Sequence, residues 1–487
     1  MKIHMLGHAS IVVETQDCRI LMDPVLWDPF CEGLNESCPQ RNVFPEQLAA
    51  LDVLIISHQH LDHFDIRSLA YLPKQVDVFI PHDPLIQDCL HQLGYRHVYP
   101  LSDFTTVKFG STSLTTTRSE IPVPEFGVVF ADPSGIFWNT VDTLFAPSTI
   151  QAIRQTYPTI DFLLATWMVS MEGRYQSNQP LAFPFELYGS LFNLMSLIEP
   201  KAIAPGAQGF KYVGSSAWQN QVVFPVSRER FCHDLKTAFP ELESTIFCLD
   251  PGDVLTLEKG KSTHQVGQSH YVTMTVDDRE CVEFSPVKAG NPLIDTNPDG
   301  YELTLMSQVI EEELTVHLPD FIHRHRHSLF RQHCIWNVIY EIEVVFPDGA
   351  KRWWFDFSKD LIQTQLGRQP LANLLTCVTA SDLYSLMVRD RDWDYLYCSG
   401  NFRTFHTVYS MTRLGISSAE GVAIPDPVQI KFPSGHVAGN NLHQAIAQWA
   451  TPNASPAPEQ EDGSMIKLGN LLIKRRDVAK ARGDRSQ

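Results

Sequence analysis

Three histidines and one aspartate fall within six residues of this 487-residue chain, in the stretch LIISHQHLDHFD (54–65). Neutral imidazole and carboxylate groups are ligands that Zn²⁺, Fe²⁺ and Mn²⁺ prefer in proteins. In this H-x-H-x-D-H pattern, His58 and His60 can share one metal ion, while Asp62 and His63 turn toward a second. Two such ions can hold a water or an oxygen between them. We therefore predict a metal site here; the alternative is a set of surface histidines.

The residues that precede this cluster, Leu51–Ile56, are mostly apolar and partly β-branched. Such a run is typical of a buried strand, so the cluster begins where a strand ends, at the edge of a sheet. Residues 2–24 alternate between apolar and polar types around ETQD, which indicates a hairpin. Further strands are predicted at 76–80, 114–116, 128–130 and 136–138, and helices at 84–94 and 187–198. Strands and helices mixed over about 250 residues predict a layered α/β domain, residues 1–260.

A second, smaller α+β domain is predicted for residues 268–450, after a polar connection at 249–264. Its clearest element is a pair of alternating strands around a Pro-Asp-Gly turn within 340–357. Residues 451–487 have the composition of a linker followed by a basic tail, which we expect to be solvated.

The overall composition excludes several classes of partner. The 38 basic and 56 acidic residues give a formal net charge of −18, which disfavours nucleic acids and anionic membrane surfaces. The ten cysteines include no C-x-x-C pair, and the ligand pairs of a Rieske cluster are incomplete. No apolar run approaches the length of a membrane span. We expect a cytoplasmic protein with reduced thiols.

The histidine cluster, together with LGHAS (6–10) and LMDP (21–24), resembles the metallo-β-lactamase superfamily over roughly residues 1–255. The resemblance implies an αββα sandwich that binds two divalent metal ions at one edge. It implies a catalytic role for Asp62 and Asp142, with Asp142 bridging the two ions. The metal ligands that it implies are His58, His60, Asp62, His63, Glu120 and Asp142. Three further residues would line the site or orient the ligands, namely His8, Asp23 and Gln208.

This sequence departs from the family pattern at two ligands. The family usually has a histidine some twenty residues before the bridging aspartate, and no histidine lies there. Counting back 22 residues from Asp142 gives Glu120, with Glu125 as the less favoured alternative. The last histidine of the family is also missing, because residues 206–208 are Gly-Ala-Gln.

These departures favour one branch of the superfamily. A glutamate in place of a histidine makes the site harder and more anionic, which favours iron over zinc, with manganese also possible. The pattern resembles the di-iron oxygenase branch, and the stretches 137–143 and 204–225 resemble the CMP-N-acetylneuraminate hydroxylase group. That resemblance implies a sterol-carrier-like second domain. Without a complete Rieske motif, the electrons would come from an external ferredoxin or reductase.

We therefore favour an iron-dependent hydroxylase acting on a small or carrier-bound organic substrate. The first alternative is a hydrolase of a phosphodiester, lactone or amide, in which the metals activate water. The second alternative is a degenerate domain that binds a ligand without catalysis.

Aromatic residues in loops of the first domain are predicted to wall a substrate pocket, with the second domain as a lid. They are Trp27, Phe30, Trp167 and Phe210. A local patch at Lys211, Arg228 and Arg230 is expected to hold a phosphate or carboxylate. The aromatic stretch 393–409 is favoured as core over a pocket wall.

A second histidine run, FIHRHRHSLFRQH (321–333), contains His323, His325, His327 and His333. His323 and His327 are four residues apart and could share a helix face. We interpret the run as a basic surface, and the alternative is a second metal site.

Overall fold

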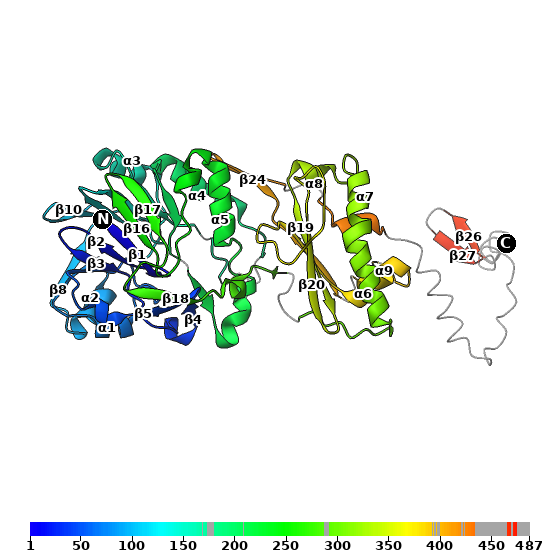
Figure 1. Cartoon of the computed structure of the whole chain (residues 1–487), viewed down its shortest axis with the longest axis horizontal. Helices are drawn as coiled ribbons and strands as arrows, with labels where there is room; N and C mark the ends of the chain where they lie inside the picture. Colours follow the sequence, from blue (N-terminus) through cyan, green and yellow to red (C-terminus); the bar gives the residue numbers. More distant parts are fainter. Residues whose placement is uncertain are drawn as a thin grey trace, which may run out of the picture.

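The computed structural model describes residues 1–167, 169–172, 180–207, 209–286, 292–391, 393, 396, 400–419, 422, 424–433, 465–468 and 471–474. Figure 1 shows a first unit at the N-terminal end of the chain and a second unit beside it. The first unit is built on two β-sheets with helices packed on their outer faces.

The first sheet has eight strands in the order β17-β16-β1-β2-β3-β6-β7-β8. Their bounds are β1 (Lys2–Gly7), β2 (Ser10–Glu14), β3 (Arg19–Met22), β6 (Val53–Ile55), β7 (Asp77–Pro81), β8 (His97–Leu101), β16 (Val254–Glu258) and β17 (Lys261–Gln265). Strands β3, β6, β7 and β8 run parallel, so their carboxyl ends lie at the same edge. The histidine cluster follows β6 at that edge.

The second sheet has six strands in the order β14-β13-β12-β11-β10-β9. Their bounds are β9 (Thr106–Phe109), β10 (Thr112–Thr116), β11 (Val128–Asp132), β12 (Gly135–Asn139), β13 (Phe162–Ala165) and β14 (Ile203–Pro205). The turn ADPSG (131–135) joins β11 to β12, which are the strands predicted at 128–130 and 136–138.

Side chains alternate across these strands as the period of two requires. In β2, Ile11 and Val13 point into the core between the two sheets, while Val12 points to the outer face. That outer face is covered by α1 (Ile66–Tyr71) and α2 (Pro84–Gln92). The outer face of the second sheet is covered by α3 (Pro147–Thr156), α4 (Phe185–Ile198) and α5 (Arg228–Ala238). The first unit therefore has the predicted αββα layers.

Short elements complete the first unit. The strands β4 (Asn35–Ser37) and β15 (Phe210–Tyr212) pair, as do β5 (Gln40–Val43) and β18 (Val272–Val276). Its short helical turns are η1 (Cys31–Gly33), η2 (Pro45–Leu48), η3 (Gly214–Gln221), η4 (Pro240–Thr245) and η5 (Arg279–Val282).

Strand β18 shows that the first unit ends later in the chain than predicted. It pairs with β5, and Tyr271 and Val272 are buried in the core beneath α1 and α2. The first unit therefore extends past residue 260, and the described part of the second unit begins at residue 292. The polarity of 249–264 marks an exposed hairpin, β16–β17, rather than the end of the domain.

The second unit contains a five-stranded sheet in the order β21-β20-β19-β22-β23. These strands are β19 (Ile339–Phe346), β20 (Gly349–Asp356), β21 (Gln365–Leu366), β22 (Leu374–Thr379) and β23 (Phe402–His406). Its helices are α6 (Leu303–Glu312), the π-helical turn η7 (Glu313–His317), α7 (Leu318–Arg324), α8 (Arg331–Ile335), α9 (Ala380–Val388) and α11 (Pro427–Lys431). Helices α6 and α7 lie on the side of this sheet that faces away from the first unit (Figure 1).

A hairpin of the second unit returns to the first. Strands β24 (Tyr409–Thr412) and β25 (Gly415–Ser418) pack against α5 and α4. The Tyr409 hydroxyl donates to Asp234 of α5 at 2.5 Å, and Tyr188 of α4 donates to the same carboxylate at 2.9 Å. The two units therefore share a packed interface. A separate hairpin, β26 (Met465–Leu468) with β27 (Leu471–Lys474), lies near the C-terminus.

Among the described residues, no helix is both long enough and apolar enough to cross a membrane.

Candidate metal centre

The histidine cluster lies in a tight turn between strand β6 and helix α1. The backbone N–H groups of His63 and Phe64 both donate to the His60 carbonyl, at 2.9 and 2.8 Å. The Asp65 side chain then caps α1 by accepting from the Ser68 N–H at 3.0 Å. The cluster is therefore held between two rigid elements, which fixes the directions of its side chains.

Asp23 is the buried carboxylate around which this cluster is organised. It directly follows β3, which runs parallel to β6 with Met22 opposite Ile55, so Asp23 lies next to Ser57. Its carboxylate accepts from the Ser57 N–H at 2.7 Å, from the Ser57 hydroxyl at 2.7 Å and from His63 Nδ1 at 3.0 Å. Asp23 is fully buried, so all of these bonds are shielded from water.

These bonds determine which ring nitrogens carry protons. A carboxylate can only accept, so the His63 proton lies on Nδ1. The Ser57 hydroxyl donates to Asp23 and therefore accepts from His58 Nδ1, which lies 2.9 Å away. In neutral rings, the Nε2 atoms of His58 and His63 then both present lone pairs. Asp23 and Ser57 thus prepare two imidazoles as metal ligands.

Two carboxylates lie close to these lone pairs. His63 Nε2 is 3.2 Å from Asp142 Oδ2 and 3.7 Å from Asp62 Oδ2. This nitrogen is buried and makes no hydrogen bond. A lone pair and carboxylate oxygens repel one another, so this arrangement is stabilised by a positive charge on Nε2, supplied either by a proton or by a metal ion. A divalent metal ion can provide that charge.

Two groups of possible ligand atoms can be drawn from the described residues. His58, His63 and Asp142 form one group, and His8, Asp62 and His63 form the other, with the atoms of each lying within 4.8 Å of one another. His60 is exposed, and its Nδ1 lies 2.9 Å from His58 Nε2. The structure therefore gathers five of the six predicted ligands in one region.

His8 lies beside the ligands and contacts one of them. Its Nε2 donates to Asp62 Oδ2 at 3.0 Å, and its ring lies against Phe30 and Phe210, with centroids 6.0 and 5.2 Å away. His8 therefore holds the Asp62 carboxylate through a hydrogen bond.

The electrostatics of these groups follow from burial and from their mutual proximity. Burial lowers the pKa of His58 to about 3, so this ring is neutral at physiological pH. Burial also acts to lower the pKa of His63, but the Asp142 and Asp62 carboxylates outweigh it and raise that pKa well above its usual range. The local field thus attracts a positive charge to His63 Nε2.

The sixth predicted ligand, Glu120, does not point into this region. Its side chain is 43% exposed and forms an ion pair with Arg118 at 3.4 Å. Glu125 is instead buried and accepts a hydrogen bond from Ser119. Burial and the charge of Asp142 raise the Glu125 pKa to about 7. The favoured glutamate is therefore displaced from the centre, because counting residues backwards could not show how the loop after β10 folds.

The loop that replaces the last histidine of the family packs closely on its neighbours. A Cβ atom on Gly206 would lie 3.0 Å from the Ala165 carbonyl oxygen, and one on Gly209 would lie 3.2 Å from the Cys38 carbonyl oxygen. These glycines leave no space for a ligand side chain at either position. Gln208, which was also predicted here, lies outside the described residues.

A cavity of about 400 Å³ lies between the two units, beside this centre. Trp167 and Phe210 line it, as does the ring of His8. Trp27 does not, because its ring packs against Tyr71 and Arg67 at the surface near α1. The predicted patch at Lys211 is also not free, because Lys211 forms ion pairs with Asp278 and Glu36.

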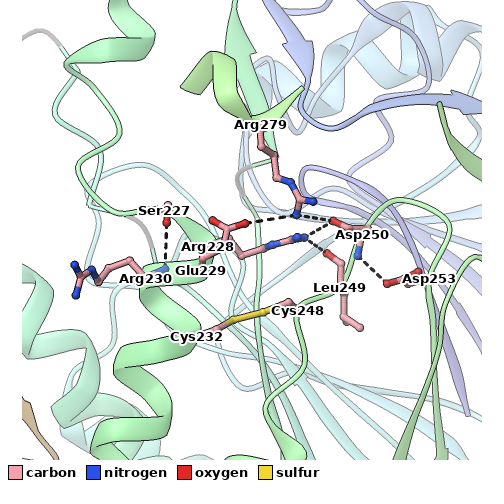
Figure 2. The surroundings of a disulfide bond; sticks show 10 residues. All are labelled: Ser227, Arg228, Glu229, Arg230, Cys232, Cys248, Leu249, Asp250, Asp253 and Arg279. Atoms are coloured by element: carbon pink, nitrogen blue, oxygen red, sulfur yellow. Dashed lines mark hydrogen bonds and ion pairs between the residues drawn. A yellow bond between two sulfur atoms is a disulfide. The ribbon is translucent and has the colours of Figure 1, made fainter. Parts of the chain in front are cut away.

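A disulfide joins Cys232 of α5 to Cys248, near the cavity-lining residues Arg228 and Leu249 (Figure 2). The expectation that all thiols are reduced is therefore wrong for this pair. The bond fixes the start of α5 next to residues 249–250, where Arg228 donates to the Leu249 carbonyl at 2.8 Å and to the Asp250 carboxylate. Arg279 reaches the same carboxylate at 3.4 Å (Figure 2).

Sequence reasoning missed three residues with parts in these sites. Ser57 orients His58, and its hydroxyl next to the first histidine was the available signal. Leu375 and Phe405 of the second unit line the cavity. Phe405 belongs to the aromatic stretch 393–409, for which a pocket wall was the less favoured interpretation, whereas nothing in the local sequence of Leu375 indicates its role.

A comparison with protein families identifies the N-terminal segment. Residues 2–130 match the family model described as a beta-lactamase superfamily domain. With the αββα layers described above, the first unit therefore has the metallo-β-lactamase fold.

Curated relatives are similar to parts of the chain. A protein of Salinibacter ruber named as a metal-dependent hydrolase is 26% identical over 212 residues, which cover 42% of this chain and 83% of that protein. A putative Rieske 2Fe-2S iron-sulfur protein of Mycobacterium tuberculosis is 30% identical over 115 residues. That match covers 21% of this chain and only 20% of the mycobacterial protein.

Solved structures give more distant similarities. An isothiocyanate hydrolase from Delia radicum gut bacteria aligns with a TM-score of 0.40 and 15% identity, over 53% of this chain and all of the other. The diiron β-hydroxylase CmlA from Streptomyces venezuelae aligns with a TM-score of 0.33 and 16% identity, over 43% of this chain and 45% of the other.

Proposed function

Because residues 2–130 match the β-lactamase superfamily domain, we propose that the chain is a metal-dependent hydrolase centred on His58, His63, Asp62 and Asp142. One observation carries the proposal. The hydrogen bond from His63 Nδ1 to Asp23 leaves His63 Nε2 buried, without a hydrogen bond, and close to the carboxylates of Asp142 and Asp62.

The residues of the centre have separate roles. Asp23 and Ser57 hold the protons of the two imidazoles on Nδ1, which keeps Nε2 available. His8 holds Asp62 through its Nε2. When bound at such a site, divalent ions supply Lewis acidity and lower the pKa of a water molecule. Asp62 and Asp142 are the carboxylates that would help to hold the metal and accept a proton from such a water.

The name of one relative supports this class of reaction. The Salinibacter ruber protein, of which the alignment covers 83%, bears the name of a metal-dependent hydrolase. That name states no substrate. The reaction class is therefore tested with both neutral and anionic substrates.

The test is hydrolysis of p-nitrophenyl acetate, bis-p-nitrophenyl phosphate and a simple lactone by protein that has been stripped of metal and reloaded with Zn²⁺, Mn²⁺ or Fe²⁺. We expect release of product from at least one probe, dependent on added metal and abolished in His63→Ala. A matched control is His323→Ala, which removes an exposed histidine of the second unit. Hydrolysis that survives both metal removal and His63→Ala would contradict the proposal.

A second candidate, an iron-dependent oxygenase, is supported by the carboxylate-rich surroundings of the centre. Three carboxylates, those of Asp62, Asp142 and the buried Glu125, lie near the buried histidines, and oxygen ligands favour iron over zinc. Electrons would then come from an external ferredoxin or reductase. Iron in the protein as purified, together with substrate-dependent consumption of O₂ in the presence of a reductant, would favour this candidate. Zinc content and no O₂ consumption would exclude it.

A further inference from the structure

We infer that the cavity between the two units receives the neutral, apolar body of the substrate, and that Leu375 and Phe405 of the second unit limit its length. The inference rests on the proposed function and adds the class of substrate to it.

The position of the cavity connects it to the metal centre. The His8 ring lines the cavity, while its Nε2 donates to Asp62 at 3.0 Å. A molecule in the cavity would therefore contact the residue that orients a proposed metal ligand. The reactive group would lie at the His8 end, and the remainder would extend toward the second unit. A volume of about 400 Å³ lies in the usual range for small-molecule sites.

The walls from the first unit are mostly apolar. Phe210 packs edge-on against His8 and Phe224, with ring centroids 5.2 and 5.3 Å apart. Trp167 satisfies its indole N–H by donating to the carbonyls of Gly206 and Ala207, at 3.2 and 3.0 Å. Since that polar group is already bonded, Trp167 offers the cavity only apolar surface.

The second unit supplies the opposite wall through strand alternation. In β22, Leu374 points into the core beneath α6 and α7, and Leu375 points into the cavity. In β23, Phe402 lies in the same core, while Phe405, three residues on, lines the cavity. Leu375 and Phe405 therefore present apolar surface to the cavity from the face of the five-stranded sheet opposite its core.

The charges around the cavity balance, which argues against a phosphate or carboxylate as the recognised group. Its lining contains four arginines and four acidic residues: Arg228, Arg230, Arg279 and Arg368, with Glu229, Asp277, Glu280 and Glu283. Each arginine is already engaged. Arg228 bonds to Asp250, Arg279 pairs with Asp277, Arg368 pairs with Glu283, and Arg230 donates to the Leu371 carbonyl. This corrects the expectation of an anion-binding patch and leaves apolar contact as the main source of affinity.

The test uses the neutral fluorescent probe N-phenyl-1-naphthylamine with the full-length protein. We expect saturable binding with enhanced fluorescence, weakened about tenfold or more by Leu375→Trp, because the larger side chain fills an apolar pocket. The matched control is Leu414→Trp, at a position 89% exposed on the β24–β25 turn of the same unit. Loss of binding in Leu375→Trp alone supports the inference. No binding, or equal binding in both variants, overturns it.

A second measurement separates this inference from the proposed function. The substrates are p-nitrophenyl acetate and p-nitrophenyl octanoate. We expect Leu375→Trp to lower the ratio of kcat/KM for octanoate to kcat/KM for acetate about tenfold. We also expect the fluorescent probe to inhibit octanoate hydrolysis competitively. Turnover of octanoate that the probe does not inhibit would overturn the inference. If no ester is hydrolysed, but the probe binds and Leu375→Trp prevents that binding, the proposed hydrolase function is contradicted. The assignment of an apolar ligand to the cavity then still stands.

Discussion

The chain contains two histidine-rich segments that look alike in sequence and differ in structure. In the segment after β6, His63 is fully buried, with Asp23 at 3.0 Å from one ring nitrogen and Asp142 at 3.2 Å from the other. In the segment 321–333, the buried member is His333, whose Nε2 donates to the Pro425 carbonyl at 2.9 Å. The His333 ring otherwise lies among Phe330 and Phe357, and its Nδ1 makes no hydrogen bond.

The comparison shows that histidine density does not define a metal site. Both groups of possible metal ligands among the described residues lie around the first segment. His323 and His327, which were considered as a metal-binding pair, are exposed and belong to neither group. What distinguishes the first segment is the set of acceptor-only carboxylates on both sides of a buried ring.

The largest effect is expected from removing that ring. In His63→Ala, both groups of possible ligands lose a shared member. We expect loss of tightly bound metal and a fall in kcat/KM of about 1,000-fold or more. Elemental analysis and steady-state kinetics measure the two effects. His323→Ala should change neither, and equal losses in both variants would remove the distinction between the segments.

A smaller effect is expected from the carboxylate that orients the ring. Asp23→Asn replaces an acceptor oxygen by a donor, so the amide cannot accept from both His63 Nδ1 and Ser57. Metal affinity should fall by about 10- to 100-fold. The matched control is Asp253→Asn. Asp253 lies away from the metal centre and accepts a hydrogen bond from His264 at a distance of 2.7 Å. Metal titration of the stripped proteins measures both, and an unchanged affinity in Asp23→Asn would contradict the role of Asp23.

The second segment predicts an effect of pH on stability that does not depend on metal. Burial lowers the pKa of His333 to about 4, below its value of about 6.5 in an unfolded chain. Neutral His333 therefore makes its full contribution to the free energy of unfolding above pH 6.5, and this contribution is lost as the pH falls toward 4. We expect this loss to be about 2 kcal/mol between pH 7 and pH 4.5.

Urea unfolding followed by tryptophan fluorescence at the two pH values measures this effect, with His333→Gln as the comparison. The variant should show a smaller loss of unfolding free energy on acidification than the parent protein. The same pH dependence in both proteins would show that His333 is not a buried neutral group.

The smallest effect should come from the glutamates of the loop after β10. Glu125→Gln should lower metal affinity about tenfold if this buried carboxyl group supports the centre. Glu120→Gln is the matched control, because Glu120 is 43% exposed and pairs with Arg118. Titration with Fe²⁺ and Zn²⁺ in parallel would show whether Glu125 favours iron. A larger effect from Glu120→Gln would restore the original prediction.

The parts of this molecule that local patterns encode could be predicted from sequence. The strand before the histidine cluster, the ADPSG hairpin and helix α4 all follow from periodicity within a few residues. Asp23 and Asp142 could be found because family resemblance assigned them to strand ends. The parts that depend on long-range packing could not be predicted. Examples are the pairing of β18 with β5, the choice between Glu120 and Glu125, and the cavity walls at Leu375 and Phe405.

The β24–β25 hairpin has a mechanical consequence for access to the cavity. Besides the chain connection after η5, several side-chain contacts attach the second unit to the first, among them Tyr409 on Asp234 and Arg368 with Glu283. A body held at one point can swing as a hinge, whereas a body held at two points resists rotation until one attachment is released. Opening of this interface would therefore require the hairpin to undock, with loss of the Tyr409–Asp234 hydrogen bond.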